Sequence, residues 1–262
     1  MPSYRDEVLI LKRRAYRDHD VLLTLFTKQH GKVAAVAKGV RRPQHKMAGA
    51  LQPLNWSDVA LYRGRSNLET VTEALLKQGF WRIADELERL SWALVLVDVL
   101  DQLWPEREPS PPSFDLVAAA LGALNEGRPA SSVGLAAGFR LLAIAGFLPD
   151  MGQCSVCGEA FHRGVVTIDV TSGQVLCQTC APTHSAADRI RLGSLRSLQY
   201  WLRDQPERLG RAVVTGPMKG ELEHLFFRYV LHETAKPLKS YQFLQNLDRM
   251  AHGPEGGKHA DH

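Results

Sequence analysis

The sequence has no apolar run long enough to cross a bilayer and no secretory signal. Its two most apolar stretches are interrupted by Asp98 and by Arg140, so neither supplies the roughly 20 uninterrupted apolar residues that a membrane helix needs. The first residues, Met1 to Glu7, lack the apolar region of a signal peptide. These absences predict a cytoplasmic protein that does not contact a membrane.

The sequence also lacks the complete motifs of common enzymes. The run from His232 to Lys236 begins like the H-E-x-x-H motif of metalloproteases, but Lys236 occupies the position of the second histidine. Gly31-Lys32 is followed by Val33 and has no upstream glycine, so it is not a phosphate-binding loop. No carboxylate cluster is evident either. The sequence therefore predicts a protein that is not an enzyme and has no catalytic residues.

Net charge is small, at +4, but it is unevenly distributed over the 262 residues. Residues 1–80 contain 14 Lys and Arg against 7 Asp and Glu, whereas residues 81–150 contain 5 against 10. Residues 151–262 contain 13 against 11. A basic first third followed by an acidic middle indicates an N-terminal domain that binds a polyanion and a second domain with a different role.

The first 80 residues have the pattern of a small β domain. Short runs rich in Val, Leu and Ile alternate with turn-like breaks, and no helical repeat appears before the end of this region. Five strands in so short a region fit a closed barrel better than a sandwich, because closure leaves no unpaired edges. The expected strands are Val8–Leu11, Val21–Thr27, Lys32–Ala37, Trp56–Tyr62 and Leu68–Leu76.

Beyond Phe80 the apolar residues recur at helical spacing. Prolines between Pro105 and Pro112 end the first helical stripe, which begins at Trp81. The polar, glycine-rich end of the chain, 248–262, has the composition of a flexible tail. We therefore expect an α+β protein with a barrel domain over 1–80, a helical domain over 81–247 and the tail. Further helices are expected at Ser113–Asn125, Ser131–Leu148, Leu192–Leu202 and Met218–Leu231.

Four cysteines form the most specific motif of the chain. Two C-x2-C pairs, Cys154 with Cys157 and Cys177 with Cys180, are separated by 19 residues. Four thiolates satisfy tetrahedral zinc and leave no open position for water, so the pattern predicts one structural Zn²⁺ in a zinc ribbon over 151–183. Two disulfides are the alternative, but they need an oxidising compartment. A redox pair would normally stand alone.

A glycine- and proline-punctuated loop after the third expected strand concentrates positive charge. Lys38, Arg41, Arg42 and Lys46 lie between Lys38 and Gly49. Cations on such a loop can follow phosphates without reading sequence, although a charged loop is often only solvated.

Short segments with a particular order and spacing extend along the chain to about Leu247. In the barrel region they are Tyr16–Asp20, Leu23–Thr27, Gly31-Lys32, Val36–Arg42, Gly49–Leu54 and Tyr62–Arg65. Downstream they are Arg140–Pro149, the four cysteines and Lys236–Ser240. In this order and spacing the segments closely resemble RecO proteins, a family of bacterial DNA repair and recombination proteins.

The resemblance implies an N-terminal OB-fold, an α-helical domain with an inserted zinc ribbon, and a place in the cytoplasm at the nucleoid. It also implies binding to single- and double-stranded DNA, strand annealing, a complex with RecR and a contact with the C-terminal tail of single-strand-binding protein that helps to load RecA. The main DNA-binding candidates are then Lys38, Arg41, Arg42 and Lys46. Arg14, Arg63, Arg65 and the stacking residue Tyr62 are secondary candidates.

Arg140 is the expected contact of the partner's tail. Its helix is otherwise almost wholly apolar, and a guanidinium beside an apolar groove suits an acidic tail that ends in an apolar residue. An internal salt bridge, for example to an acid of the preceding helix such as Asp98 or Asp101, is the alternative for this arginine. For the whole protein the alternative is a zinc-ribbon transcription regulator, which would select one DNA sequence, whereas a RecO-like protein would prefer none.

Overall fold

The N-terminal domain is a closed barrel of five strands. The computed structural model describes residues 3–64, 68–181 and 187–252. Neighbouring strands follow the order β1-β2-β3-β5-β4, and β4 closes the barrel against β1. All five predicted strands are confirmed, and the closed five-stranded barrel is of the OB type. The strands are β1 (Ser3–Tyr16), β2 (Asp20–Thr27), β3 (Gly31–Ala37), β4 (Trp56–Tyr62) and β5 (Glu69–Gln78).

Alternation along the strands separates two cores. Inward-facing residues of β2 and β3, such as Leu23 and Val33, fill the barrel interior. Outward-facing Leu9 and Phe26 belong to a second and larger core, which continues into the helical domain. Phe26, for example, packs edge-to-face against Trp104, with ring centroids 6.3 Å apart. The barrel is therefore apolar inside and also on the side that meets the helices.

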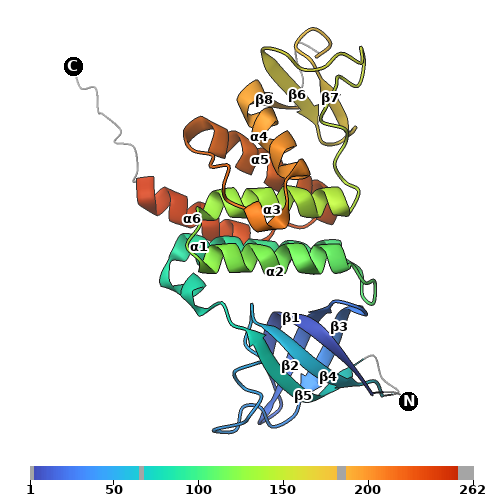
Figure 1. The fold of residues 1–262 in the computed structure, drawn as a ribbon, viewed down its shortest axis with the longest axis vertical. Coiled ribbons are helices and arrows are strands. Elements are labelled where there is room, and N and C mark those ends of the chain that lie inside the picture. Colours follow the sequence, from blue (N-terminus) through green and yellow to red (C-terminus); the bar gives the residue numbers. More distant parts are fainter. Residues whose placement is uncertain (1–2, 65–67, 182–186, 253–262) are drawn as a thin grey trace, which may run out of the picture.

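Helices form the second domain, in which α1, α2 and α3 lie between the barrel and the β-ribbon of the insertion (Figure 1). Two short 3-10 helices accompany six α-helices in the described part of the chain. The elements are η1 (Trp81–Asp85), α1 (Leu87–Leu103), α2 (Pro111–Asn125), α3 (Ala130–Ile144), α4 (Leu192–Arg203), η2 (Pro206–Arg208), α5 (Gly216–Thr234) and α6 (Lys239–His252).

Several helix boundaries differ from the sequence prediction. The first helix does not begin at Trp81, because Glu86 is extended and separates η1 from α1. The third helix ends at Ile144 rather than Leu148, because Gly146 adopts a left-handed conformation with φ of 81°. The second helix begins at Pro111, since proline is tolerated in the first helical turn.

α6 was missed by the sequence prediction. It extends to His252, so the first five residues of the predicted tail, 248–252, are helical. Leu238 and Leu244 are buried, and the ring of Tyr241 stacks on Phe227 of α5. Residues 253–262 of the predicted tail lie outside the described residues.

The insertion between α3 and α4 contains a three-stranded sheet. β6 (Val165–Asp169) pairs with β7 (Gln174–Leu176) in the predicted hairpin, and Gly173 has the positive φ of 68° that this turn needs. β8 (Asp188–Arg191) pairs with the other edge of β6 and was not predicted. Residues 182–186, which include the end of the predicted ribbon, are not described.

Polar contacts fasten the barrel to the helical domain. Lys32 on β3 forms an ion pair with Asp101 of α1 at 3.3 Å. At Gly31 the two domains meet backbone to backbone, because a Cβ there would lie 2.4 Å from the carbonyl oxygen of Glu108. The backbone N–H of Arg107 donates to the carbonyl of Lys32 at 2.9 Å. The α1–α2 loop is thereby pinned to β3.

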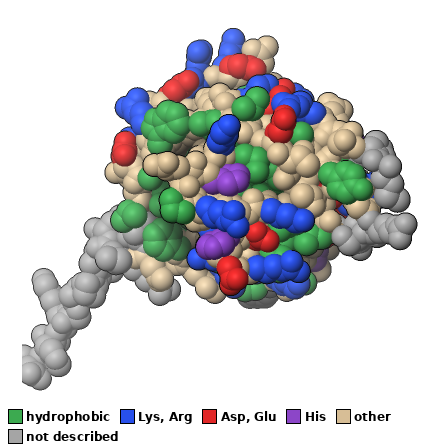
Figure 2. All heavy atoms as spheres, turned by 90° about the horizontal axis from the view of Figure 1, so that it is seen from below, with side chains coloured by type: hydrophobic (Ala, Val, Ile, Leu, Met, Phe, Trp, Pro, Cys, Tyr) green, Lys and Arg blue, Asp and Glu red, His purple; other side chains and the backbone are tan. Residues whose placement is uncertain are grey.

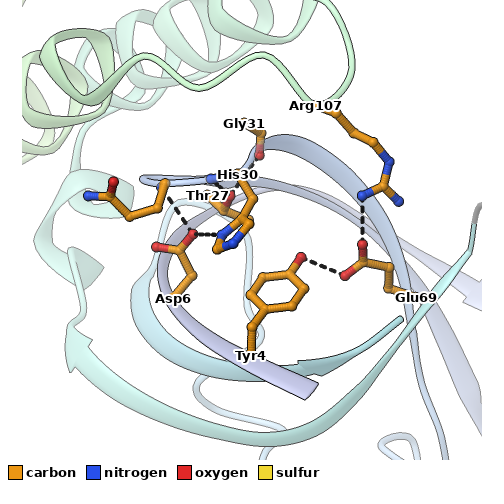
Figure 3. A network of polar contacts seen from close by, with 8 residues as sticks. Tyr4, Asp6, Thr27, His30, Gly31, Glu69 and Arg107 are labelled. Atoms are coloured by element: carbon orange, nitrogen blue, oxygen red, sulfur yellow. Dashed lines mark hydrogen bonds and ion pairs between the residues drawn. The ribbon is translucent and has the colours of Figure 1, made fainter. Parts of the chain in front are cut away.

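A buried carboxylate, that of Glu69, adds an ionic contact at this joint (Figure 3). Glu69 is fully buried at the start of β5. It accepts hydrogen bonds from the hydroxyl of Tyr4, at 2.6 Å, and from the guanidinium of Arg107, at 2.9 Å. Burial and the Glu69 contact raise the pKa of Tyr4, so the phenol remains a donor at neutral pH. We refer to Tyr4, Glu69 and Arg107 as the clasp.

Candidate nucleic-acid interface and metal centre

The loop between β3 and β4 carries the predicted main DNA contacts on residues 38–49, here named the cationic loop. It lies on the β1–β2 turn: the N–H of Arg41 donates to the carbonyl of His19 at 2.9 Å, and that of Gly39 to Oδ1 of Asp20 at 2.8 Å. On the side of the barrel away from the helices, Lys, Arg and His side chains gather (Figure 2). The exposed cations of the loop are Lys38, Arg41, Arg42 and Lys46.

Several other cations of the barrel have an acidic partner. Lys28, for example, pairs with Asp115 at 2.6 Å. Within the part of the chain that the structure describes, no carboxylate lies within ion-pair distance of Lys38, Arg42 or Lys46. An exposed cation without an internal partner is available to a phosphate, and counterion release then contributes to binding.

The secondary candidates divide between the two ends of the barrel. The strand directions place the β1–β2 turn and the cationic loop at one end, and the β4–β5 loop at the other. Arg14, exposed near the end of β1, lies at the cationic-loop end. Tyr62, 45% exposed, and Arg63 lie at the opposite end. Arg65 lies outside the described residues.

The β1–β2 turn supplies basic residues that sequence reasoning missed. Arg17 and His19 are exposed on this turn. Nη1 of Arg41 donates to the carbonyls of Arg17 and Asp18, at 3.4 and 3.3 Å, which fixes the turn against the cationic loop. The sequence contained this signal. In three consecutive antiparallel strands, the turn between the first and second strands lies at the same end of the sheet as the loop that follows the third strand.

The four cysteines converge in the insertion. Their Sγ atoms all lie within 4.8 Å of one another, and Sγ of Cys157 is 3.9 Å from Sγ of Cys177. Four sulfurs around a tetrahedral Zn²⁺ lie roughly 3.8 Å apart, given a Zn–S distance of about 2.3 Å. A disulfide would need about 2.05 Å, and all four cysteines are free. The cluster thus fits a metal ion and not two disulfides.

Local backbone geometry prepares this cluster for a metal. Gly158 has φ of 73°, and its N–H donates to the carbonyl of Cys154, which closes the first turn. Burial opposes ionisation of the Cys154 thiol, but hydrogen bonds from the N–H groups of Cys157, Cys177 and Val156 outweigh it and lower its pKa to about 6. A thiolate is the form that binds a metal.

Two of the arginines that follow the insertion are engaged within the protein. Nη2 of Arg196 donates to the carbonyl of Phe161 at 2.9 Å, which ties α4 to the insertion. Nε of Arg191 pairs with Glu221 at 3.3 Å. These contacts give both arginines a structural role.

Arg140 lies half-buried on α3, and its Nη1 atom is buried without a hydrogen-bond partner among the described residues. Burial lowers its pKa, whereas Asp204 and Glu207 act in the opposite direction. The alternative salt bridge to Asp98 or Asp101 is wrong, because both carboxylates face Lys12 of the barrel.

Side chains near Arg140 leave an apolar surface on the last turn of α3. Ile144, one turn further along, is 40% exposed. Phe147 and Leu148, just beyond the helix, are partly exposed. The unpartnered Nη1 atom of Arg140 thus lies one helical turn from the exposed side chain of Ile144.

Among the described helices, none combines the length and the apolarity that a membrane span requires. An OB-type barrel with a cationic loop, joined to a helical domain and a four-cysteine ribbon, places the chain among proteins of the OB class, an architecture that commonly binds oligonucleotides.

Comparison with known proteins assigns the family. The family model "Recombination protein O N terminal" matches residues 1–80, and "Recombination protein O C terminal" matches residues 84–242. The DNA repair protein RecO of Desulforamulus reducens is 32% identical over 249 residues, covering 94% of this chain and 96% of the relative. That of Heliobacterium modesticaldum is 33% identical over 258 residues, covering 95% and 92%. The chain belongs to the RecO family of DNA repair and recombination proteins.

Proposed function

We propose that this protein binds single- and double-stranded DNA through the cationic loop, without selecting a sequence. The observation that carries the proposal is the set of exposed cations on this loop, three of which have no acidic partner in the described part of the chain. Contacts to phosphates set affinity and orientation but carry no base information. Arg14, Arg17 and His19 extend the same surface, whereas Tyr62 and Arg63 form a separate contact at the other end of the barrel.

Salt dependence tests the DNA interface. If Lys38, Arg41, Arg42 and Lys46 each neutralise one phosphate, their replacement by Ala flattens the log–log salt slope on single strands by roughly 2.8, at about 0.7 per contact. Affinity falls for all DNA sequences alike. The control replaces Lys28 and Lys77, whose ammonium groups pair with Asp115 and Glu7, and leaves the slope nearly unchanged. An unchanged slope in the fourfold variant refutes the assignment.

We propose further that the protein acts as a mediator in recombination rather than as an enzyme. In this role it anneals strands and, with RecR, helps to load RecA onto DNA coated by single-strand-binding protein. Family membership supports this role, and the unsatisfied guanidinium of Arg140 supports a contact with the acidic C-terminal tail of single-strand-binding protein. Such work takes place in the cytoplasm, at the nucleoid.

One structural Zn²⁺ completes the proposal, with Cys154, Cys157, Cys177 and Cys180 as ligands. The support is the donor chemistry, because four thiolates at tetrahedral spacing leave no open coordination position. A closed site of this kind stabilises the fold and performs no chemistry.

A further inference from the structure

A groove lies between the cationic loop and β5. Its volume is about 690 Å³, within the range of roughly 300–1,000 Å³ that is typical of ligand sites. β5 pairs with β3 only as far as Val71. Beyond Val71, residues 72–75 of β5 form one wall of the groove, and residues 44–47 of the loop form the other.

The two walls differ in chemistry. On the β5 side Leu75 is 61% exposed, which is unusual for so large an apolar side chain on a strand. On the loop side stand Lys46 and the ring of His45. Met47, which packs against the barrel core, completes the apolar part of the lining. The groove therefore combines apolar side chains, a flat ring and a cation.

A backbone contact orients the ring of His45. The N–H of Met47 donates to Nδ1 of His45 at 3.3 Å. In the neutral ring the proton is therefore on Nε2, which remains available as a donor. The amide of Gln44 adds a further donor and acceptor at the same wall.

We propose that this groove receives one unstacked nucleobase of single-stranded DNA held on the cationic loop; the inference rests on the proposed function. A base has two apolar faces and a polar edge. The faces can pack against Leu75 and the ring of His45, and the edge can form hydrogen bonds with Nε2–H of His45 and with the amide of Gln44. Lys46 contacts the neighbouring phosphate. Glu73, which also lines the groove, is paired with Arg5, and this pairing reduces its repulsion of the strand.

The groove gives the protein a means to distinguish unpaired from paired strands. Bases in a duplex are stacked and cannot enter without losing their neighbours, and unstacking costs free energy. The cationic loop contacts both forms of DNA through phosphates, whereas the groove adds a contact that only a single strand makes.

The first test compares two oligonucleotides of equal length and charge, an oligothymidylate and its abasic counterpart. Leu75→Ser should weaken binding to oligothymidylate roughly five-fold, at the low end of what one base contact contributes. Binding to the abasic strand should not change. The matched control is Leu231→Ser on α5, where the side chain is 48% exposed, and it should alter neither affinity. His45→Ala is the second variant and should behave like Leu75→Ser.

Failure of the inference and failure of the proposed function have different signatures. If Leu75→Ser and His45→Ala leave both affinities unchanged, the nucleobase site is wrong and DNA binding by the loop stands. If the unaltered protein binds neither strand, the proposed function itself fails. If Leu75→Ser loses binding to a polyglutamate peptide but keeps its affinity for DNA, the groove is a site for a protein partner and the inference is overturned.

Cross-linking supplies a direct measurement. Oligothymidylate that carries one 5-iodouracil is bound to the full-length protein and the complex is irradiated. The cross-linked residue is then located by mass spectrometry. The inference predicts adducts within residues 44–47 or 72–75, which are lost in His45→Ala. Adducts confined to other parts of the barrel overturn it.

Discussion

The cationic loop and the cysteine ribbon, residues 154–180, are both irregular segments that carry functional side chains, but they gain their order differently. In the loop, backbone hydrogen bonds such as that from Ala48 to His45, at 3.0 Å, build successive turns. Val40 anchors the loop in the barrel core with only 1% exposure. In the ribbon, four thiols converge around one point.

This difference separates function from stability. The backbone of the loop is held by its own hydrogen bonds and by Val40. Removal of the cations should therefore change DNA affinity and leave the fold intact. The thiols join the turns at the two ends of the ribbon, so their removal should change the fold of that segment and leave DNA affinity intact. Four substitutions, from the largest expected effect to the smallest, test this contrast.

Cys177→Ser should have the largest effect. A structural zinc contributes on the order of 10 kcal/mol to the folding of a small metal-binding module. We expect loss of the single bound zinc and loss of amide protection across 154–180, while the barrel stays protected and DNA affinity changes less than twofold. Zinc assay and hydrogen exchange measure these effects. Thr179→Ala, an exposed position between two ligands, is the control and should retain the metal. Full zinc content in the serine variant would contradict the assignment.

Arg107→Ala tests a site where charge does serve stability. Among the described residues, the substitution leaves the fully buried carboxylate of Glu69 with the Tyr4 hydroxyl as its remaining side-chain partner. It should lower the free energy of unfolding by about 2 kcal/mol, as expected for a buried polar group that loses a partner. Arg5→Ala removes the exposed ion pairs with Asp58 and Glu73 and should cost less than about 1 kcal/mol in chemical denaturation. Equal losses in the two variants would show that the clasp is an ordinary surface contact.

Arg140→Ala should weaken binding of a labelled acidic tail peptide about tenfold, which corresponds to about 1.4 kcal/mol. The reason is the loss of a charge-assisted contact to the terminal carboxylate. Fluorescence anisotropy measures the binding, and a melting curve accompanies it. A large drop in melting temperature with peptide binding retained would indicate a structural role through Asp204 and Glu207 instead.

Asp20 is the position at which substitution should have the smallest of the four effects. Its carboxylate accepts the N–H of Gly39 and so positions the loop, but it also places a negative charge beside the cations. Asp20→Asn keeps an acceptor and removes the charge, and should strengthen DNA binding about twofold at low salt. Asp20→Ala also removes the acceptor and should bind more weakly than the Asn variant. Identical affinities in the two variants would show that the loop needs no such anchor.

Patterns local in sequence predicted much of this molecule. An apolar run that includes Leu23 and Leu25, bounded by turn-like breaks, located a strand, and the two matched C-x2-C pairs predicted that four thiols converge. The missed α6 also had a local signal, because Leu238, Tyr241 and Leu244 recur every three residues. Which end of the barrel a candidate occupies depends on how the strands pair when the barrel closes. The sequence prediction therefore placed Arg63 and Arg14 in one group, although they lie at opposite ends of the barrel. The groove at Leu75 was equally out of reach, since residues about 30 positions apart form its walls.

The close approach at Gly31 has a mechanical consequence. Any side chain there would collide with the backbone at Glu108, and the neighbouring hydrogen bond from Arg107 to Lys32 holds the same joint. These contacts oppose movement of the barrel relative to the helices. If DNA binds the barrel and an acidic peptide binds at Arg140, as proposed, this joint would set the distance between the two ligands.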